Sequence, residues 1–266
     1  MPSRARPRPR SKQTAELARP PHERELLRIC GLAAVLALFD RDPERVERLF
    51  FEPALRGALD ANCQVLARTH KPYRQVDSVE LTRVAGTALH GGAVAIARPR
   101  PLVDLDPDAV REWAQDGKPL LILDGIGNPH NLGAIARSAA FFGLGRIVLA
   151  DRPDQALPSD AAYRVAEGGL EHLMLYRARL PPVLRTVGRA YHIIGTSLAG
   201  GSAGINRTGD RPVALILGNE KTGLDTTTLA LCDEVVRIPG SGHVQSLNVA
   251  SAAAILIYLL TRSPSG

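Results

Sequence analysis

The chain has 266 residues, of which 45% are hydrophobic, so it is long and apolar enough to bury one large core or two moderate ones. Its net charge is +6, but residues 1–20 hold six basic side chains against one acid, which leaves only +1 for the rest. The two most apolar stretches, residues 26–39 and 247–260, are both shorter than the roughly 20 residues that a bilayer-spanning helix needs. The composition therefore argues against a membrane protein and predicts a soluble one.

Residues 1–22 form a basic tail, which has three prolines among its first nine residues and no apolar run. This composition predicts disorder. Two interpretations of the tail stay open: an electrostatic arm that is attracted to phosphates, or a solvated terminus without a role. No apolar segment and cleavage site follow the charges, so a secretory signal is not expected.

The cysteines and histidines give no metal-ligand pattern. Cys30, Cys63 and Cys232 are widely scattered, and none of the seven histidines stands at a ligand spacing from another. We therefore expect no metal site, and unpaired cysteines fit a reducing cytoplasm.

Residues 23–98 alternate helical and extended patterns, which predicts a small α/β domain. Helices are expected over residues 25–39, 53–69 and 78–85, the last beginning at a serine cap. Strands are expected over residues 45–51, 73–77 and 93–97. Residues 99–118 are expected to be a linker with a short helix near 108–115. Trp113 in this linker is expected to pack at the domain junction, because a tryptophan is costly to leave exposed.

From residue 119 to residue 266 the pattern is regular. Strands are expected over residues 119–123, 146–150, 173–176, 191–196, 212–217 and 234–238. Helices are expected over residues 132–142, 159–168, 182–189 and 226–231, and at the C-terminus. Strands that alternate with helices predict a mostly parallel sheet with helices on both faces. Such sheets bind ligands beyond the carboxyl ends of their strands.

Three polar, glycine-rich segments stand at those strand ends, and we expect them to form one site. They are residues 123–137, 216–223 and 237–251. The first contains Gly125-Ile-Gly127, but a dinucleotide-binding loop wants a third small residue where His130 stands, so a nicotinamide-dependent oxidoreductase is disfavoured. Neither of the other glycine-rich stretches, 218–223 and 200–209, has the Gly-Lys-Ser/Thr ending of a phosphate loop.

Taken singly, the polar side chains of these segments have ordinary structural interpretations. Asn131, Ser246 and Asn248 could each cap a helix, and Glu220 could be a surface charge. Arg137 could be a solvated arginine, although small neighbours leave room for its guanidinium to bind a phosphate through two N–H groups. Their joint occurrence on converging loops is what favours a site.

In order and spacing, the three segments resemble the signature motifs of the TrmH/SpoU branch of the SPOUT RNA methyltransferases. The matching stretches are residues 128–139, 217–224 and 238–249. Residues 23–98, which end in His90-Gly-Gly92, resemble more weakly the substrate-binding domain that precedes the catalytic domain in many members. Two departures from the family pattern occur: Gly240 stands where many members have methionine, and Ala250 where many have serine.

The resemblance implies S-adenosylmethionine-dependent methylation of a ribose 2′-hydroxyl in tRNA or rRNA, a C-terminal trefoil knot and a homodimer. The implied active-site residues are Asn131, Arg137, Glu220, Ser246 and Asn248. The implied cofactor contacts are Thr196 and backbone groups at Gly218, Ile238 and Leu247. Arg137 is often described in the family as a base, whereas its permanent charge favours a phosphate clamp. The alternative function is an RNA-binding or ribosome-assembly factor that keeps the fold without catalysis.

Overall fold

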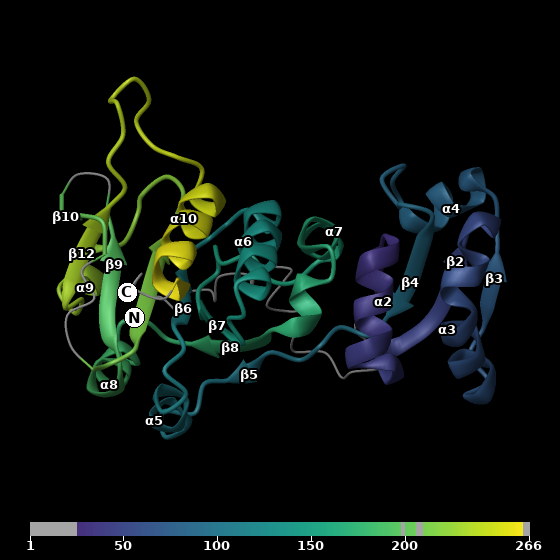
Figure 1. Cartoon of the computed structure of the whole chain (residues 1–266), viewed down its shortest axis with the longest axis horizontal. Coiled ribbons are helices and arrows are strands. Elements are labelled where there is room, and N and C mark those ends of the chain that lie inside the picture. The colour runs from purple at the N-terminus through teal and green to yellow at the C-terminus, as the bar shows by residue number, and fades with distance from the viewer. Residues whose placement is uncertain (1–25, 198–199, 206–209, 263–266) are drawn as a thin grey trace, which may run out of the picture.

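The computed structural model describes residues 26–197, 200–205 and 210–262, so the basic tail at residues 1–22 lies outside the described part of the chain. The described residues form two domains, which lie side by side in Figure 1. Among these residues, no helix combines the length and the apolar character needed to cross a membrane.

The N-terminal domain is a four-stranded sheet with helices. Its elements are β1 (Leu27–Cys30), α2 (Leu32–Arg41), η2 (Pro43–Arg45), β2 (Val46–Phe51), η3 (Pro53–Leu55), α3 (Arg56–Arg68), β3 (Tyr73–Gln75), α4 (Ser78–Ala85) and β4 (Ala93–Ala97). The strand order is β1-β4-β2-β3. Strand β4 runs antiparallel to β1 and β2, and β3 runs parallel to β2. The expected small α/β domain is present.

Two local expectations for this domain were wrong. A helix was expected over residues 25–39, but Leu27–Cys30 forms strand β1, which pairs with β4. Gly31, at φ 96°, then turns the chain, and the helix α2 begins only at Leu32. The helix α4 is capped by Asp77 rather than by Ser78, since the Asp77 carboxylate accepts a hydrogen bond from the backbone N–H of Glu80 at 2.7 Å.

The C-terminal domain is an eight-stranded sheet. Its strands are β5 (Val103–Asp104), β6 (Leu120–Asp124), β7 (Arg146–Ala150), β8 (Met174–Ala178), β9 (His192–Thr196), β10 (Ser202–Ala203), β11 (Val213–Gly218) and β12 (Glu234–Arg237). Its helices are α5 (Ala109–Ala114), α6 (Pro129–Phe141), α7 (Asp160–Ala166), η4 (Gly169–His172), α8 (Leu184–Ala190), α9 (Thr226–Leu229) and α10 (Val249–Thr261). The strand order is β10-β12-β9-β11-β6-β7-β8-β5, and neighbouring strands are parallel throughout the described sheet.

Helices cover both faces of this sheet, as the alternation predicted. On strand β6, Leu121 and Leu123 face one core with residues of α6, α7 and α10, whereas Leu120 and Ile122 face a second core with residues of α5 and α8. Successive strand residues point to opposite faces, so each side of the strand is buried under a helical layer. Figure 1 shows α6 and α10 packed side by side on the first face.

Part of the segment expected to be a linker belongs to this sheet. Val103 and Asp104 form edge strand β5, which pairs with β8. The expectation that Trp113 packs at the domain junction was wrong. Its ring lies 4.5 Å from that of Tyr176 in β8, and the guanidinium of Arg146 lies 5.0 Å from its centre. Trp113 is buried in the second core because α5 folds back beneath the C-terminal sheet.

Candidate active site

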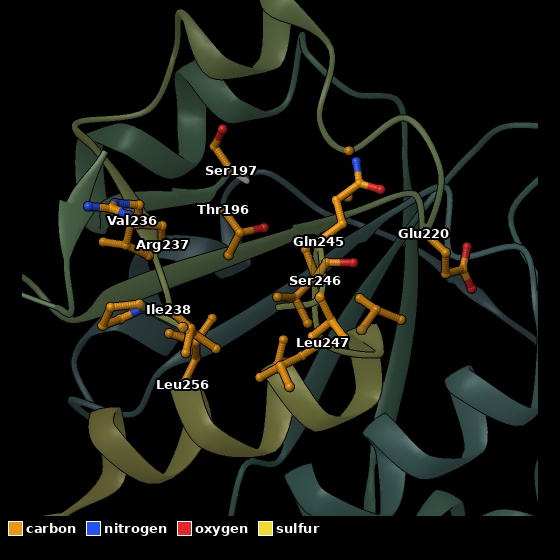
Figure 2. A pocket seen from close by; sticks show the side chains of 18 of the residues that line it. Thr196, Ser197, Glu220, Val236, Arg237, Ile238, Gln245, Ser246, Leu247 and Leu256 are labelled. Carbon is orange, nitrogen blue, oxygen red and sulfur yellow. The ribbon is translucent and has the colours of Figure 1, made fainter. Parts of the chain in front are cut away.

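A pocket of about 370 Å³ opens at the carboxyl ends of β9, β11 and β12. Thr196 ends β9, Gly218 ends β11 and Ile238 follows β12, and all three line the pocket together with Leu247. The four positions expected to contact a cofactor therefore meet in one cavity. Glu220 and Ser246 line it too. In Figure 2, Glu220 lies on the opposite side of the pocket from Arg237 and Ile238, with Gln245, Ser246 and Leu247 between them.

The loop after β6 is held to the loop after β11 by Glu220. Its carboxylate accepts hydrogen bonds from the Asn131 side chain at 2.8 Å and from the backbone N–H groups of Gly127 and Asn128 at 3.1 and 3.2 Å. Partial burial raises the pKa of Glu220, but these donors more than offset burial and leave the pKa below its usual value. Glu220 is therefore a carboxylate at neutral pH and a weak base.

Asn131 connects Glu220 to the C-terminal helix. The Asn248 side chain donates to the Asn131 side-chain oxygen at 3.1 Å, while its own oxygen accepts from the backbone N–H of Ala250 at 2.8 Å. Asn248 is thus the N-cap of α10, as one interpretation of the sequence proposed. Asn131 does not cap α6, because Asn128 does so by accepting from His130. Three expected site residues, Asn131, Glu220 and Asn248, form one continuous hydrogen-bonded chain.

Two further side chains, which the sequence analysis did not single out, fix the same loops. The buried Gln155 accepts from the backbone N–H groups of Gly125 and Ile126 at 2.9 and 3.2 Å and donates to the carbonyl oxygens of Ile126 and Ala156. Asn219 donates to the carbonyl oxygen of Gly125 at 2.7 Å. Asn219 could have been found from its place in the Gly218–Gly223 loop. Gln155 stands in no motif, so no local signal marks it.

Gly218 allows the second loop to fold tightly. A Cβ atom at Gly218 would lie 2.4 Å from the backbone carbon of Gly223 and 2.5 Å from the backbone nitrogen of Leu224. No side chain fits there without moving the backbone. Residues of the segment 217–223 line the pocket, and residues 125–131 are hydrogen-bonded to them without lining it. We call the two segments together the bonded wall, because hydrogen bonds hold both in place.

The third segment has a different character. Residues 239–248 are all exposed, and the one hydrogen bond that residues 238–247 make among the described residues joins the backbone N–H of His243 to the Ser241 hydroxyl at 3.4 Å. In Figure 1 this segment projects beyond the sheet between β12 and α10. We call residues 238–247 the open wall. Ser246 lies in it and lines the pocket.

Arg137 lies apart from the other expected site residues within one chain. It stands six residues beyond Asn131 on α6, about 9 Å further along the helix axis. It is not among the residues that line the pocket, and its guanidinium forms an ion pair with Glu167 at 2.8 Å. The sequence alone could not show that Arg137 lies away from the pocket. Arg137 belongs to the same motif as Asn131, and the direction of its side chain depends on how α6 packs against α7.

An exposed apolar surface lies at the end of α6. The side chain of Phe141 is 82% exposed and that of Tyr258 in α10 is 51% exposed, with Phe142 between them in contact with both rings. Ile255 adds a further exposed apolar side chain on α10. A monomeric protein has little reason to expose neighbouring aromatic rings, so this surface is a candidate contact face.

The described residues contain no group of three or more histidine, cysteine, aspartate or glutamate side chains that could hold a metal ion. The polar groups at the pocket are hydroxyls, amides, backbone atoms and the charged side chains of Glu220 and Arg237. Val236, Ile238, Leu247 and Leu256 supply its apolar lining. Such a lining, with few polar groups in fixed positions, suits an organic molecule.

Two family models match the chain. The SpoU rRNA methylase family matches residues 118–258, and a family described as RNA 2′-O ribose methyltransferase substrate binding matches residues 28–103. The 23S rRNA (guanosine-2′-O-)-methyltransferase RlmB of Acinetobacter baylyi is 33% identical over 247 residues, which span 89% of this chain and 97% of that protein. The uncharacterized tRNA/rRNA methyltransferase YfiF of Escherichia coli O157:H7 is 33% identical over 88% of this chain and 67% of that protein.

Crystal structures give the same result for the fold. An AdoMet-bound rRNA methyltransferase from Sinorhizobium meliloti superposes with a TM-score of 0.69 at 25% identity, covering 89% of this chain and 87% of that one. The SpoU methyltransferase AviRb from Streptomyces viridochromogenes, in complex with AdoMet, superposes with a TM-score of 0.68 at 24% identity, covering 95% of this chain and 97% of that one.

Proposed function

Because the chain belongs to the SpoU rRNA methylase family, we infer that it is an RNA (ribose-2′-O-)-methyltransferase that uses S-adenosylmethionine. The observation that carries this function is the pocket between the second and third motif segments, whose lining residue Glu220 is joined by hydrogen bonds to Asn131 of the first segment and through it to Asn248. The names of several relatives favour ribosomal RNA as the substrate over transfer RNA. A guanosine is the target that those names specify.

The residues at the pocket suit the cofactor. Its volume of about 370 Å³ falls in the range of small-molecule sites. We propose that the backbone at Gly218, Ile238 and Leu247 holds the polar parts of S-adenosylmethionine, with Thr196 beside them, while Val236 and Leu256 contact its apolar parts. When bound, S-adenosylmethionine supplies a methyl group on a positively charged sulfur.

We propose that Glu220 organises the site rather than removing a proton. Its depressed pKa makes it a poor base, and its carboxylate already binds three N–H donors of the loop that starts α6. Asn131 and Asn248 are thereby held side by side next to Glu220, where we propose that their amides orient the ribose. Ser246 lines the same pocket and adds a hydroxyl for the substrate. Correct placement of the 2′-oxygen contributes much of the rate in such a transfer.

We propose that Arg137 binds the RNA phosphate next to the target ribose and stabilises negative charge on the 2′-oxygen. An arginine stays protonated in proteins, so electrostatic stabilisation is a better role for it than proton removal. Because Arg137 does not reach the pocket of its own chain, it would act at the pocket of a second copy. The exposed surface of Phe141, Ile255 and Tyr258 beside it supports a homodimer through α6 and α10.

The remaining features of the resemblance are proposals of the same kind. After β12 the chain returns across β11 to place α10 against α6, a path that supports a trefoil knot in this domain. The N-terminal domain, residues 23–98, would bind RNA, and the match of residues 28–103 to a substrate-binding family supports this. A ribosomal substrate supports action in the cytoplasm.

The test of the function is methyl transfer to RNA. The wild-type chain should transfer a labelled methyl group from S-adenosylmethionine to bulk bacterial RNA, and Arg137→Ala should lose transfer while calorimetry shows unchanged affinity for S-adenosylhomocysteine. Arg189→Ala, at an exposed arginine of α8 on the other face of the sheet, is the matched control and should keep full activity. No transfer by the wild type would instead favour an RNA-binding factor without catalysis, and near-normal turnover by Arg137→Ala would refute the role of Arg137.

The composite site has its own test. Arg137→Ala and Asn131→Ala are each expected to inactivate the enzyme. If Arg137 acts at the pocket of the partner, a mixed dimer of the two variants contains one site with both residues intact, so mixing should restore transfer. Absence of restoration, with mixed dimers verified by mass, would show that each chain uses its own arginine.

A further inference from the structure

The turn between α7 and β8 lies between the two domains and next to Arg137. Helix α7 ends at Ala166 and is followed by Glu167, whose backbone is left-handed at φ 45° and ψ 45°, and by Gly168 at φ 93°. Two consecutive left-handed residues reverse the chain sharply, so η4 leaves in a new direction. Most side chains avoid this backbone region, whereas glycine and asparagine tolerate it.

The turn is packed tightly from both sides. A Cβ atom at Gly168 would lie 2.9 Å from the Cβ of Ala37 in α2, which belongs to the N-terminal domain. A Cβ atom at Gly169 would lie 2.9 Å from the Cα of Arg137 in α6. Neither glycine has room for a side chain, so the backbone of the turn touches both the N-terminal domain and the helix that carries Arg137.

A buried ion cluster fastens the far end of the turn to the N-terminal domain. The Glu171 side chain has no exposed surface, and its carboxylate binds Arg45 of η2 at 2.7 and 3.0 Å and Arg100 at 2.8 Å. Arg45 also donates to the hydroxyl of Tyr163 in α7 at 3.2 Å. A buried charge group of this kind is costly to break, so the turn cannot shift without the N-terminal domain.

From this fixed position, Glu167 forms an ion pair with Arg137. Its carboxylate lies 2.8 Å from one terminal nitrogen of the guanidinium, and both side chains are about half exposed. An exposed ion pair adds little to the stability of a protein. That small gain does not account for a glutamate in a left-handed backbone conformation, which is itself unfavourable. Fold stability is therefore a poor explanation of Glu167.

We propose that Glu167 is a positioning residue for Arg137: the N-terminal domain braces the turn, and the turn presents the carboxylate that sets the direction of the guanidinium. The proposal rests on the proposed role of Arg137 in methyl transfer. One terminal nitrogen binds Glu167, which leaves other N–H groups of Arg137 without a partner among the described residues and therefore able to bind an RNA phosphate. The domain that would bind RNA and the arginine that would bind its phosphate are thus held at a fixed separation.

The test uses two substitutions at the same position. Glu167→Gln removes the charge at nearly constant shape, and Glu167→Asn removes it while introducing a residue that tolerates left-handed backbone. Asp104→Asn is the matched control: it removes an exposed ion pair with Arg177 of similar length, 2.7 Å, on edge strand β5 of the same sheet. Wild-type and variant chains are compared in full length with the same RNA.

We expect both Glu167 variants to lower kcat about tenfold, because a misdirected catalytic group is costly even when binding is intact. The KM for RNA and the affinity for S-adenosylhomocysteine should stay within twofold, and the Tm of Glu167→Asn should not fall below that of the wild type. Asp104→Asn should leave kcat unchanged. The proposal is overturned if both Glu167 variants keep kcat within twofold of the wild type, or if only KM changes, since Glu167 would then be an RNA contact.

A second measurement does not depend on activity, so it separates this proposal from the proposed function. Phenylglyoxal modifies arginine, and a bound carboxylate protects the guanidinium. Peptide mass spectrometry should show faster modification of Arg137 in Glu167→Gln and Glu167→Asn than in the wild type and in Asp104→Asn. Equal rates in all four proteins would overturn the proposal even if methyl transfer is confirmed. An inactive wild type would contradict the proposed function alone.

Discussion

The two walls of the pocket differ in how far they are organised before any ligand binds. In the bonded wall, Gln155, Asn219 and Glu220 fix backbone groups of residues 125–128. In the open wall, residues 239–247 are exposed and make one hydrogen bond among the described residues. The hydrogen bonds are thus concentrated in the bonded wall, which is the wall that would orient the ribose. The open wall keeps unbonded backbone groups for a cofactor, whose binding would organise that side.

The largest effect should come from removing Gln155. Gln155→Leu would leave two buried N–H groups and one or more carbonyl oxygens at the base of the bonded wall without their partner, because this side chain makes four hydrogen bonds there. Unsatisfied buried groups of this kind cost about 1–3 kcal/mol each, so we expect a loss of about 3 kcal/mol in the free energy of unfolding. Urea unfolding at neutral pH measures it.

The control for this prediction is Gln75→Leu, at an exposed position of β3, where the change should be about 0.5 kcal/mol or less. If Gln155→Leu lowers the free energy of unfolding no more than Gln75→Leu does, Gln155 does not hold the bonded wall in place. The two walls would then differ less in stability than their hydrogen bonds indicate.

An intermediate effect is expected from a pair of glycine substitutions, one in each wall. Gly218→Ala would press a methyl group against the backbone of Gly223, so it should cost roughly 1–3 kcal/mol of stability and weaken S-adenosylhomocysteine binding. Gly240→Ala meets no atom within 4 Å and needs no positive φ, so its stability should be unchanged or slightly higher. Thermal unfolding and calorimetry measure the two quantities. Equal losses of stability would mean that the open wall is as tightly packed as the bonded one.

The smallest effect should be the pH dependence contributed by Glu220. Its pKa in the folded chain is lowered from the usual 4.5, because the hydrogen bonds from Asn131, Gly127 and Asn128 outweigh the opposite effect of burial. A depressed pKa stabilises the fold above the unfolded pKa, and this stabilisation is lost as the pH falls through the folded pKa. Since Glu220 is only partly buried and water screens its charge, we expect it to contribute only about 1 kcal/mol to the free energy of unfolding.

The measurement compares wild type with Glu220→Gln in urea at pH 7 and at a series of values below 4.5. The difference in unfolding free energy should be largest at pH 7 and should shrink on acidification. A difference that stays constant down to the lowest pH would show that the Glu220 carboxylate contributes through shape and not through charge.

The sequence predicted the main architecture because the signals for it are local and repeated. Apolar segments that alternate in length and spacing specify a parallel sheet, and the polar loops at its strand ends must then lie at one edge. Thr196, Gly218, Ile238 and Leu247, which the family resemblance implied as cofactor contacts, do line one pocket at that edge. Helix and strand bounds differ from expectation by a few residues, as they do when packing decides where an element ends.

The parts that the sequence did not predict depend on contacts between distant residues. Strand β1 is four residues long and followed by a helix, so its apolar residues fit a helical spacing equally well until β4 pairs with it. Arg45 and Glu171 are 126 positions apart, and no sequence pattern near either residue predicts that they form an ion pair. The distance of Arg137 from the pocket likewise follows from the way α6 packs against α7.

Strand β5 also changes how the molecule can be divided. A fragment that starts at residue 119 would lack an edge strand of the sheet and the helix that carries Trp113, which would uncover the side of β8 and an apolar surface around Tyr176. Such a fragment should aggregate when expressed alone. Anyone wishing to study the larger domain by itself would do better to begin the coding segment shortly before Val103, so that every strand keeps its neighbour.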